Sequence, residues 1–135
     1  MKIEVNFTLD AGDANVDVKQ WGGELQLEPT ELGQKGEAST RGKGHIISNS
    51  YWTIASARQD CDSIDDAVTN LLEGIVVQSK KVRKLVEGYK LDCGVAAFVW
   101  LEDDEDTSDI DLYLSRHTVL LLSDLYADFS VRVYE

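Results

Sequence analysis

The sequence predicts an α+β fold: a mainly antiparallel sheet with helices packed against it, as a ferredoxin-like core or an elaboration of one. Near the two ends of the chain, residues 2–9 and 129–134 alternate apolar and polar side chains, as half-buried strands do. Between them, residues 64–89 carry apolar side chains at helical spacing. A chain of 135 residues has room for one core, so we expect a single domain over residues 1–135.

The first half of the chain predicts two strands separated by weaker elements. Residues 2–9 form the first strand, and residues 51–57 form the second. Asp13 is placed to cap a short helix that ends at Gly22. Four glycines and small polar side chains over residues 33–44 predict a mobile loop.

The clearest predicted element is a helix that begins after Ser63. Ser63 and Asp66 have the spacing of a capping box. The apolar side chains behind them recur every three or four residues: Ile64, Ala67, Val68, Leu71, Leu72, Ile75 and Val76. A break is expected near Gln78, which is followed by a second helical stretch with Gly88 as its C-terminal cap.

The last third predicts a hairpin, a helix and a terminal strand. Residues 91–101 are apolar on both faces, which places this strand at the centre of a sheet or at an interface. The acidic residues 102–109 are expected to form the turn, and residues 110–114 the returning strand. Ser115 is an N-cap candidate for the next helix, and residues 129–134 close the sheet.

Composition limits the function. The formal net charge is -12, which repels nucleic-acid phosphates and anionic lipid and attracts basic proteins. No apolar run is long enough to cross a membrane, and the N-terminus lacks the basic and apolar regions of a signal peptide. Two distant cysteines then favour reduced thiols in the cytoplasm. We therefore expect a cytoplasmic protein with no membrane partner and little tendency to bind nucleic acid.

No set of side chains has the spacing of a catalytic or metal site. Cys61 and Cys93 could act as nucleophiles only beside a base, and the sequence places neither His45 nor His117 near them. No cysteine or histidine pair has zinc-finger spacing. The acidic segment, defined as residues 102–111, lacks the glycine and distal glutamate of a calcium loop. No catalytic residue, metal or cofactor is therefore predicted.

Two groups of side chains are candidates for binding. The first combines the cationic loop with tryptophans: Trp21, Lys35, Arg41, Lys43 and Trp52. Trp21 lies beside glycines in a polar stretch, which predicts an exposed recognition anchor, whereas Trp52 lies in a strand, which favours packing. The second group lies in the acidic segment: Asp103, Asp104 and Asp106.

Several short motifs also resemble one protein family. They are Leu27-Glu28-Pro29-Thr30, Lys35-Gly36-Glu37, Tyr51-Trp52 with Ser56, Leu71-Leu72 and Tyr113-Leu114-Ser115. In this order they resemble the bacterial domain-of-unknown-function family 4279 over nearly the whole chain. The first helix is poorer in apolar residues than the family pattern, and residues 131–135 follow its ending only loosely. The resemblance implies an α+β fold and a bacterial origin, and it carries over no catalytic residue.

These observations predict a non-enzymatic domain that binds another protein. A concrete version is an immunity-like protein that neutralises a basic partner, with the acidic segment steering association. The alternative is a domain for a small or nucleotide-like ligand, built from the loop at residues 33–44 beside Trp52. A hydrolase whose groups meet only on folding is a third hypothesis. A homodimer that covers one face of residues 91–101 stays open.

Overall fold

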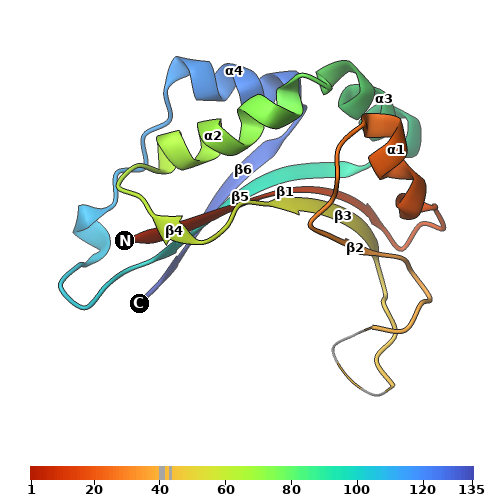
Figure 1. The fold of residues 1–135 in the computed structure, drawn as a ribbon, viewed down its shortest axis with the longest axis horizontal. Helices are drawn as coiled ribbons and strands as arrows, with labels where there is room; N and C mark the ends of the chain where they lie inside the picture. Colours follow the sequence, from red (N-terminus) through yellow and green to blue (C-terminus); the bar gives the residue numbers. More distant parts are fainter. Residues whose placement is uncertain (40–41, 43) are drawn as a thin grey trace.

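The computed structural model is a sheet with its helices on one side (Figure 1). It describes residues 1–39, 42 and 44–135. Its strands are β1 (Lys2–Gly12), β2 (Glu31–Gly33), β3 (Ser50–Ala55), β4 (Gln59–Asp60), β5 (Asp92–Trp100) and β6 (Asp128–Tyr134). Its helices are α1 (Trp21–Leu25), α2 (Ile64–Val76), α3 (Ser79–Tyr89) and α4 (Arg116–Asp124), with short 3-10 turns η1 (Val18–Gln20) and η2 (Thr107–Asp109).

The sheet has the strand order β2-β3-β1-β5-β6, and β4 pairs with the start of β1 beyond β3. All pairs are antiparallel except β5–β6. Strands β3 and β5, joined through α2 and α3, run parallel on either side of β1, which is the split βαβ unit of ferredoxin-like folds. The β5–α4–β6 unit instead joins neighbouring strands. The predicted class, an α+β fold with a mainly antiparallel sheet, is confirmed.

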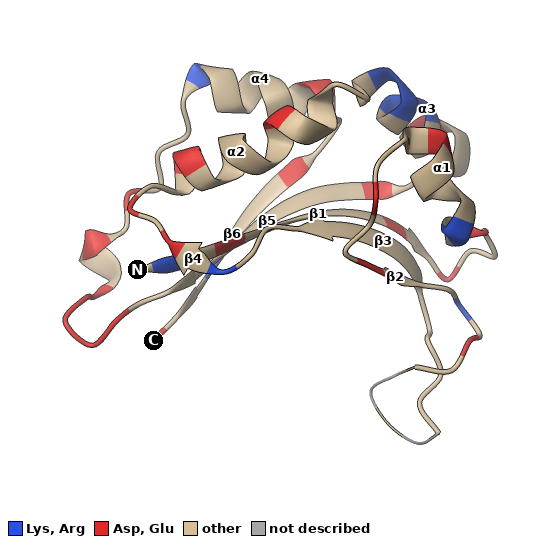
Figure 2. Ribbon diagram, viewed as in Figure 1, with Lys and Arg blue, Asp and Glu red and all other residues tan. Residues whose placement is uncertain are grey.

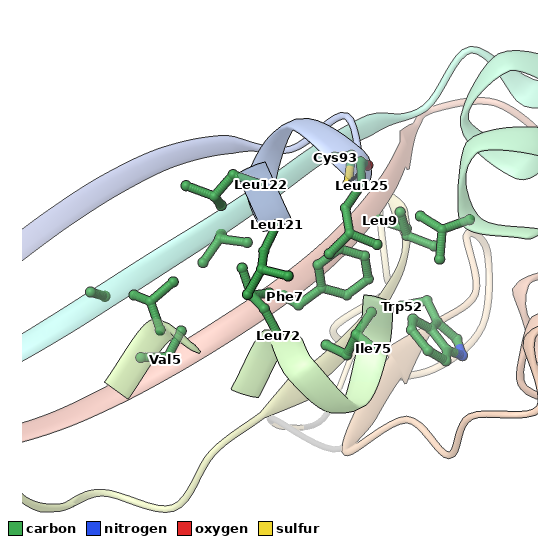
Figure 3. Packing of buried hydrophobic residues seen from close by; sticks show 14 of the residues in the cluster. Val5, Phe7, Leu9, Trp52, Leu72, Ile75, Cys93, Leu121, Leu122 and Leu125 are labelled. Carbon is green, nitrogen blue, oxygen red and sulfur yellow. Dashed lines mark hydrogen bonds between the residues drawn. The ribbon is translucent and has the colours of Figure 1, made fainter. Parts of the chain in front are cut away.

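Alternation along β1 separates the two faces of the sheet. Its odd-numbered side chains from Ile3 to Leu9 are almost completely buried beneath the helices. From above, Leu72 and Ile75 of α2 and Leu121 of α4 point toward Phe7 (Figure 3). The core therefore lies between the central strands and this pair of helices.

Three of the four ends of helices α2 and α3 lie where the sequence predicted them. The Ser63 hydroxyl accepts a hydrogen bond from the Asp66 backbone N–H at 3.1 Å, which confirms the Ser63 half of the predicted capping box. The described structure shows no reciprocal bond to the Asp66 side chain. The predicted break is also confirmed, because Gln78 precedes a new helix. The predicted cap at Gly88 is wrong: α3 ends at Tyr89, and its C-cap is Lys90, which adopts a left-handed conformation with φ of 55°. Leu91 is nearly buried, and the turn at Lys90 delivers it to the core.

The first predicted helix is also wrong in position. Asp17 caps η1, and α1 begins at Trp21 and contains Gly22 and Gly23. The poor helix propensity of paired glycines is offset because Trp21 and Leu25 are fully buried in the core. Tertiary burial thus stabilises a short helix that local sequence signals do not predict.

The predicted hairpin between residues 91–101 and 110–114 does not form. Strand β6 pairs in parallel with β5 from Gly94 to Trp100, so the second edge of β5 is already occupied. Residues 110–114 run outside the sheet, and the Leu112 side chain is 70% exposed. The prediction that β5 is an inner strand is confirmed, since it lies between β1 and β6.

The glycine-rich stretch is partly ordered rather than a loop throughout. Gly33 belongs to β2, and Ala38 forms an antiparallel bridge with Ile46. The Ser39 N–H also donates to the His45 carbonyl at 2.8 Å. The flanks of this stretch therefore form a two-stranded arm that extends from the sheet (Figure 1). Among the residues that the structure describes, no helix is long and apolar enough to span a membrane.

Candidate functional site

The acidic segment and the densest group of basic residues lie toward opposite ends of the molecule, while other residues of both signs lie between them (Figure 2). The acidic segment lies next to the N-terminus, where β1, β5 and β6 also have their ends. Helix α3, toward the other end, carries the densest group of basic side chains: Lys80, Lys81, Arg83 and Lys84. The region around the acidic segment is the acidic end of the molecule.

Part of the acidic segment is held in a fixed shape by its own carboxylates. Glu105 accepts hydrogen bonds from the Glu102 backbone N–H at 2.9 Å and from the Met1 ammonium group at 3.1 Å. These two contacts hold the pKa of Glu105 below its ordinary value, and the bond from the Glu102 N–H has the larger effect. This carboxylate therefore serves the local fold and is less available to a partner.

Asp106 has a similar structural role. Its carboxylate accepts from the Ser108 side chain and backbone, and these bonds hold its pKa below the ordinary aspartate value. Asp109 completes a capping box by accepting from the Asp106 backbone N–H at 2.8 Å. The sequence proposed Asp106 as a binding residue, whereas the structure gives it a capping contact.

Other carboxylates of the acidic segment face solvent without such partners. In the described part of the chain, four exposed ones make no hydrogen bond or ion pair through the carboxylate: Glu102, Asp103, Asp104 and Asp111. The chain then continues into Leu112 and Tyr113, whose side chains are 70% and 61% exposed. Protein–protein interfaces commonly combine a polar rim with apolar anchor residues, and unpaired carboxylates beside exposed apolar side chains have this composition.

An aromatic cluster lies at the same end, on the sheet face opposite the helices. The register places Lys2 and Tyr134 on either side of Trp100. The rings of Phe98, Trp100 and Tyr134 stack with centroids 5.2–6.4 Å apart. These three residues form the aromatic cluster. Sequence analysis noted aromatics on the second face of residues 91–101 but missed Tyr134, because parallel pairing of β5 with β6 was not predicted.

Arg58 covers part of this cluster. Its guanidinium carbon lies 3.5 Å from the centroid of the Trp100 ring, within the range of a cation–π interaction. Sequence analysis gave Arg58 no role, since nothing in the local pattern indicates that it reaches β5.

Two tryptophans predicted as binding candidates lie in the core. Trp21 is 1% exposed, so the prediction of an exposed anchor at this position is wrong. Its ring instead contacts Tyr89 of α3, with centroids 5.9 Å apart. Trp52 is fully buried, as the packing interpretation expected, although its indole N–H has no hydrogen-bond partner in the described structure. Neither ring offers a surface to a ligand.

The predicted cationic loop does not form a phosphate-binding surface in its described part. The Lys35 ammonium group donates to the Asp13 carbonyl at 2.6 Å. Arg41 and Lys43 lie outside the described residues. Beneath the arm there is a hollow of about 380 Å³ that is lined in part by Asp10 and Glu31. Two carboxylates at this hollow oppose a phosphate group.

In the described structure, neither thiol forms a hydrogen bond with an imidazole. Cys93 is buried, its Sγ donates to the Leu125 carbonyl at 3.4 Å, and burial raises the pKa of the thiol to about 12. Cys61 donates to the Ser63 carbonyl. His117 Nε2 lies 3.3 Å from Glu73 Oε1. Within the described residues no group of histidine, cysteine and carboxylate side chains could hold a metal ion.

A family model, the domain of unknown function DUF4279, matches residues 2–135. The chain belongs to this family. The resemblance seen in the sequence motifs is thereby confirmed. No curated protein and no solved structure matches the chain.

Proposed function

We propose that this DUF4279 domain binds a basic protein partner through its acidic end. The observation that carries the proposal is the acidic segment itself. Glu105, Asp106 and Asp109 fix its shape, while neighbouring carboxylates remain exposed and unpaired in the described structure. Fixed charges of one sign increase the rate of association with an oppositely charged partner and reduce the cost of ordering on binding.

Neutralisation of a basic toxin, as an immunity protein would perform it, is the form of this function that we favour. Such a role requires fast and specific association, which charge complementarity provides. It requires no catalytic group. Exposed Leu112 and Tyr113 would supply apolar anchors beside the charged rim.

The test is capture of binding proteins by the tagged domain from a lysate of the cells that encode it, with washes at low and high salt. The captured basic protein is then purified, and its association rate is measured against three forms of the domain. The wild type is compared with Asp103→Asn/Asp104→Asn, which neutralises the acidic end. The matched control is Glu24→Gln/Glu87→Gln, which makes the same change in net charge on α1 and α3.

The proposal predicts slower association and weaker salt dependence for the acidic-end variant only. Equal association rates for the two variants would show that the acidic end has no special role. A captured partner that is acidic would also contradict the proposal.

A groove between α1 and α3 favours a second candidate, a small amphiphilic ligand. Its volume is about 710 Å³. Leu25 and Leu85 contribute an apolar floor, and Lys81 and Lys84 lie at its edge together with Glu24. Apolar walls with a few charged groups are typical of ligand sites. A rise in melting temperature with a fatty-acid or acyl-phosphate panel would support this candidate; a melting temperature that none of these compounds changes would count against it.

A further inference from the structure

The position of Arg58 follows from the gap between β3 and β4, which both pair with β1. The Ser56 N–H donates to the Val5 carbonyl at 2.8 Å, and the Ser56 hydroxyl accepts from the Val5 N–H at 2.8 Å. Pairing with β1 resumes only at Gln59. The side chain of Arg58, between these points, extends across the uncovered face of the sheet and reaches the Trp100 ring.

The environment of Arg58 is unusual for a cation in an acidic protein. Its side chain is exposed and makes no ion pair or hydrogen bond in the described structure. Its one described interaction is with the face of Trp100. A cation–π contact at an exposed site is weak, so a competing cation can replace it at little cost.

We propose that the Trp100 face is an anchor site for an arginine side chain of the basic partner, and that Arg58 occupies this face until the partner displaces it. This inference rests on the proposed function and adds the residue that the partner presents. A guanidinium group can stack flat on an aromatic ring and donate to a carboxylate at the same time, which an ammonium group does less well. Glu102, with an unpaired carboxylate, lies two residues after Trp100.

The same charges disfavour the other ligands of aromatic sheet faces. Nucleobases also stack on exposed aromatic rings, and Lys2 and Arg132, which pair with Trp100 and Phe98, lie where they could contact phosphates. The net charge of -12 and the acidic segment that follows Trp100 nevertheless disfavour a polyanionic ligand. Arg58 already demonstrates which chemical group this ring accepts within the protein itself.

The test uses two synthetic peptides of equal charge as probes, one alternating arginine with serine and one alternating lysine with serine. The measured quantity is the ratio of the two dissociation constants, because a change in the net charge of the protein affects both peptides alike. Wild type is compared with Arg58→Ala and with Arg132→Ala, which removes one positive charge from the same sheet face beside Phe98.

In Arg58→Ala the preference for the arginine peptide should rise about two- to fivefold, whereas Arg132→Ala should leave it near the wild-type value. Trp100→Leu should reduce the preference to about one. Because Trp100 contributes to the sheet, the folding of the Trp100→Leu variant is checked by circular dichroism. The comparison of Arg58→Ala with Arg132→Ala does not depend on this variant.

The anchor site would be overturned if Arg58→Ala and Arg132→Ala changed the preference for the arginine peptide equally. It would also be overturned if Trp100→Leu left that preference unchanged. These results would leave the proposed function standing if Asp103→Asn/Asp104→Asn still weakens both peptides. Peptide affinities that none of these substitutions changes would contradict both proposals.

Discussion

The two faces of the sheet use alternate residues of the same strands and differ in what covers them. On one face, Phe7 and its neighbours along β1 lie beneath α2 and α4 with almost no exposed area (Figure 3). On the other face, no described helix covers the sheet, yet it carries stacked rings at Phe98, Trp100 and Tyr134.

Under the proposed function, this difference corresponds to a division between stability and recognition. The covered face needs its apolar side chains to form a core, since burial of apolar area is the dominant stabilising term in folding. The uncovered face needs no core, so large aromatic side chains there have another explanation. These side chains lie beside the acidic segment, where partner binding is proposed. This position is consistent with a role in recognising that partner.

The largest expected difference is between two phenylalanines on opposite faces. Phe7→Ala should lower the free energy of unfolding by about 3–5 kcal/mol, because it leaves a cavity in a closed core. Phe98→Ala removes stacking on the open face and should cost about 1–2 kcal/mol. Urea unfolding followed by circular dichroism measures both. Equal losses would mean that the open face is also covered in solution, for instance by a homodimer.

A smaller effect is expected where α2 meets α4. The Asp65 carboxylate accepts hydrogen bonds from the Ser115 N–H at 2.9 Å and from the Thr118 hydroxyl. Asp65→Ala should cost about 1–3 kcal/mol, since the Ser115 N–H and the hydroxyl of buried Thr118 both lose their carboxylate acceptor. The matched control is Asp66→Ala in the same turn, because the Asp66 side chain has no described partner. If both variants lose the same free energy of unfolding, the charge at the helix terminus explains the loss, and the hydrogen bonds of Asp65 to Ser115 and Thr118 do not.

The hydrogen bonds of Asp65 also predict how stability depends on pH. Burial would raise the pKa of Asp65, but hydrogen bonds from Thr118 and Ser115 outweigh it and hold the pKa below the ordinary aspartate value. Because the folded-state pKa is depressed, this stabilisation is present above the unfolded-state pKa and is lost as pH falls through the folded-state pKa. Asp65→Asn should therefore flatten the acid side of the stability profile between about pH 5 and 2. An unchanged acid slope in this variant would refute the assignment.

The smallest effect on stability is expected at the acidic end. Asp103→Asn/Asp104→Asn should change the free energy of unfolding by no more than about 0.5 kcal/mol, because both side chains are exposed and without described partners. Thermal melts of this variant and of Glu24→Gln/Glu87→Gln measure the effect. A loss above about 1 kcal/mol for the acidic-end variant would assign these carboxylates to the fold.

Local patterns predicted the elements that depend on local chemistry. The alternation of β1, the Ser63 cap and the break at Gln78 are determined by residues close in sequence. The α+β class followed from their order. Strand pairing is a matter of distant contacts, which is why β6 rather than residues 110–114 occupies the second edge of β5.

The binding surface was predictable only in part. The charge of the acidic segment is visible in the sequence, but which carboxylates are used in capping is visible only in the structure. Trp21 stands in a polar stretch and is nevertheless buried, because helix α1 turns it toward the core. Arg58 and Trp100 are far apart in sequence, and only the break between β3 and β4 brings them together.

The central claim is that the exposed carboxylates of the acidic end, Asp103 and Asp104 among them, serve binding and not stability. The most direct measurement determines, for Asp103→Asn/Asp104→Asn and for its charge-matched control, both the free energy of unfolding and the association rate with the captured basic partner. The account predicts that the acidic-end variant keeps its stability and associates more slowly, by about tenfold at low salt, while the control associates at close to the wild-type rate. An acidic-end variant that associates as fast as the control would contradict it.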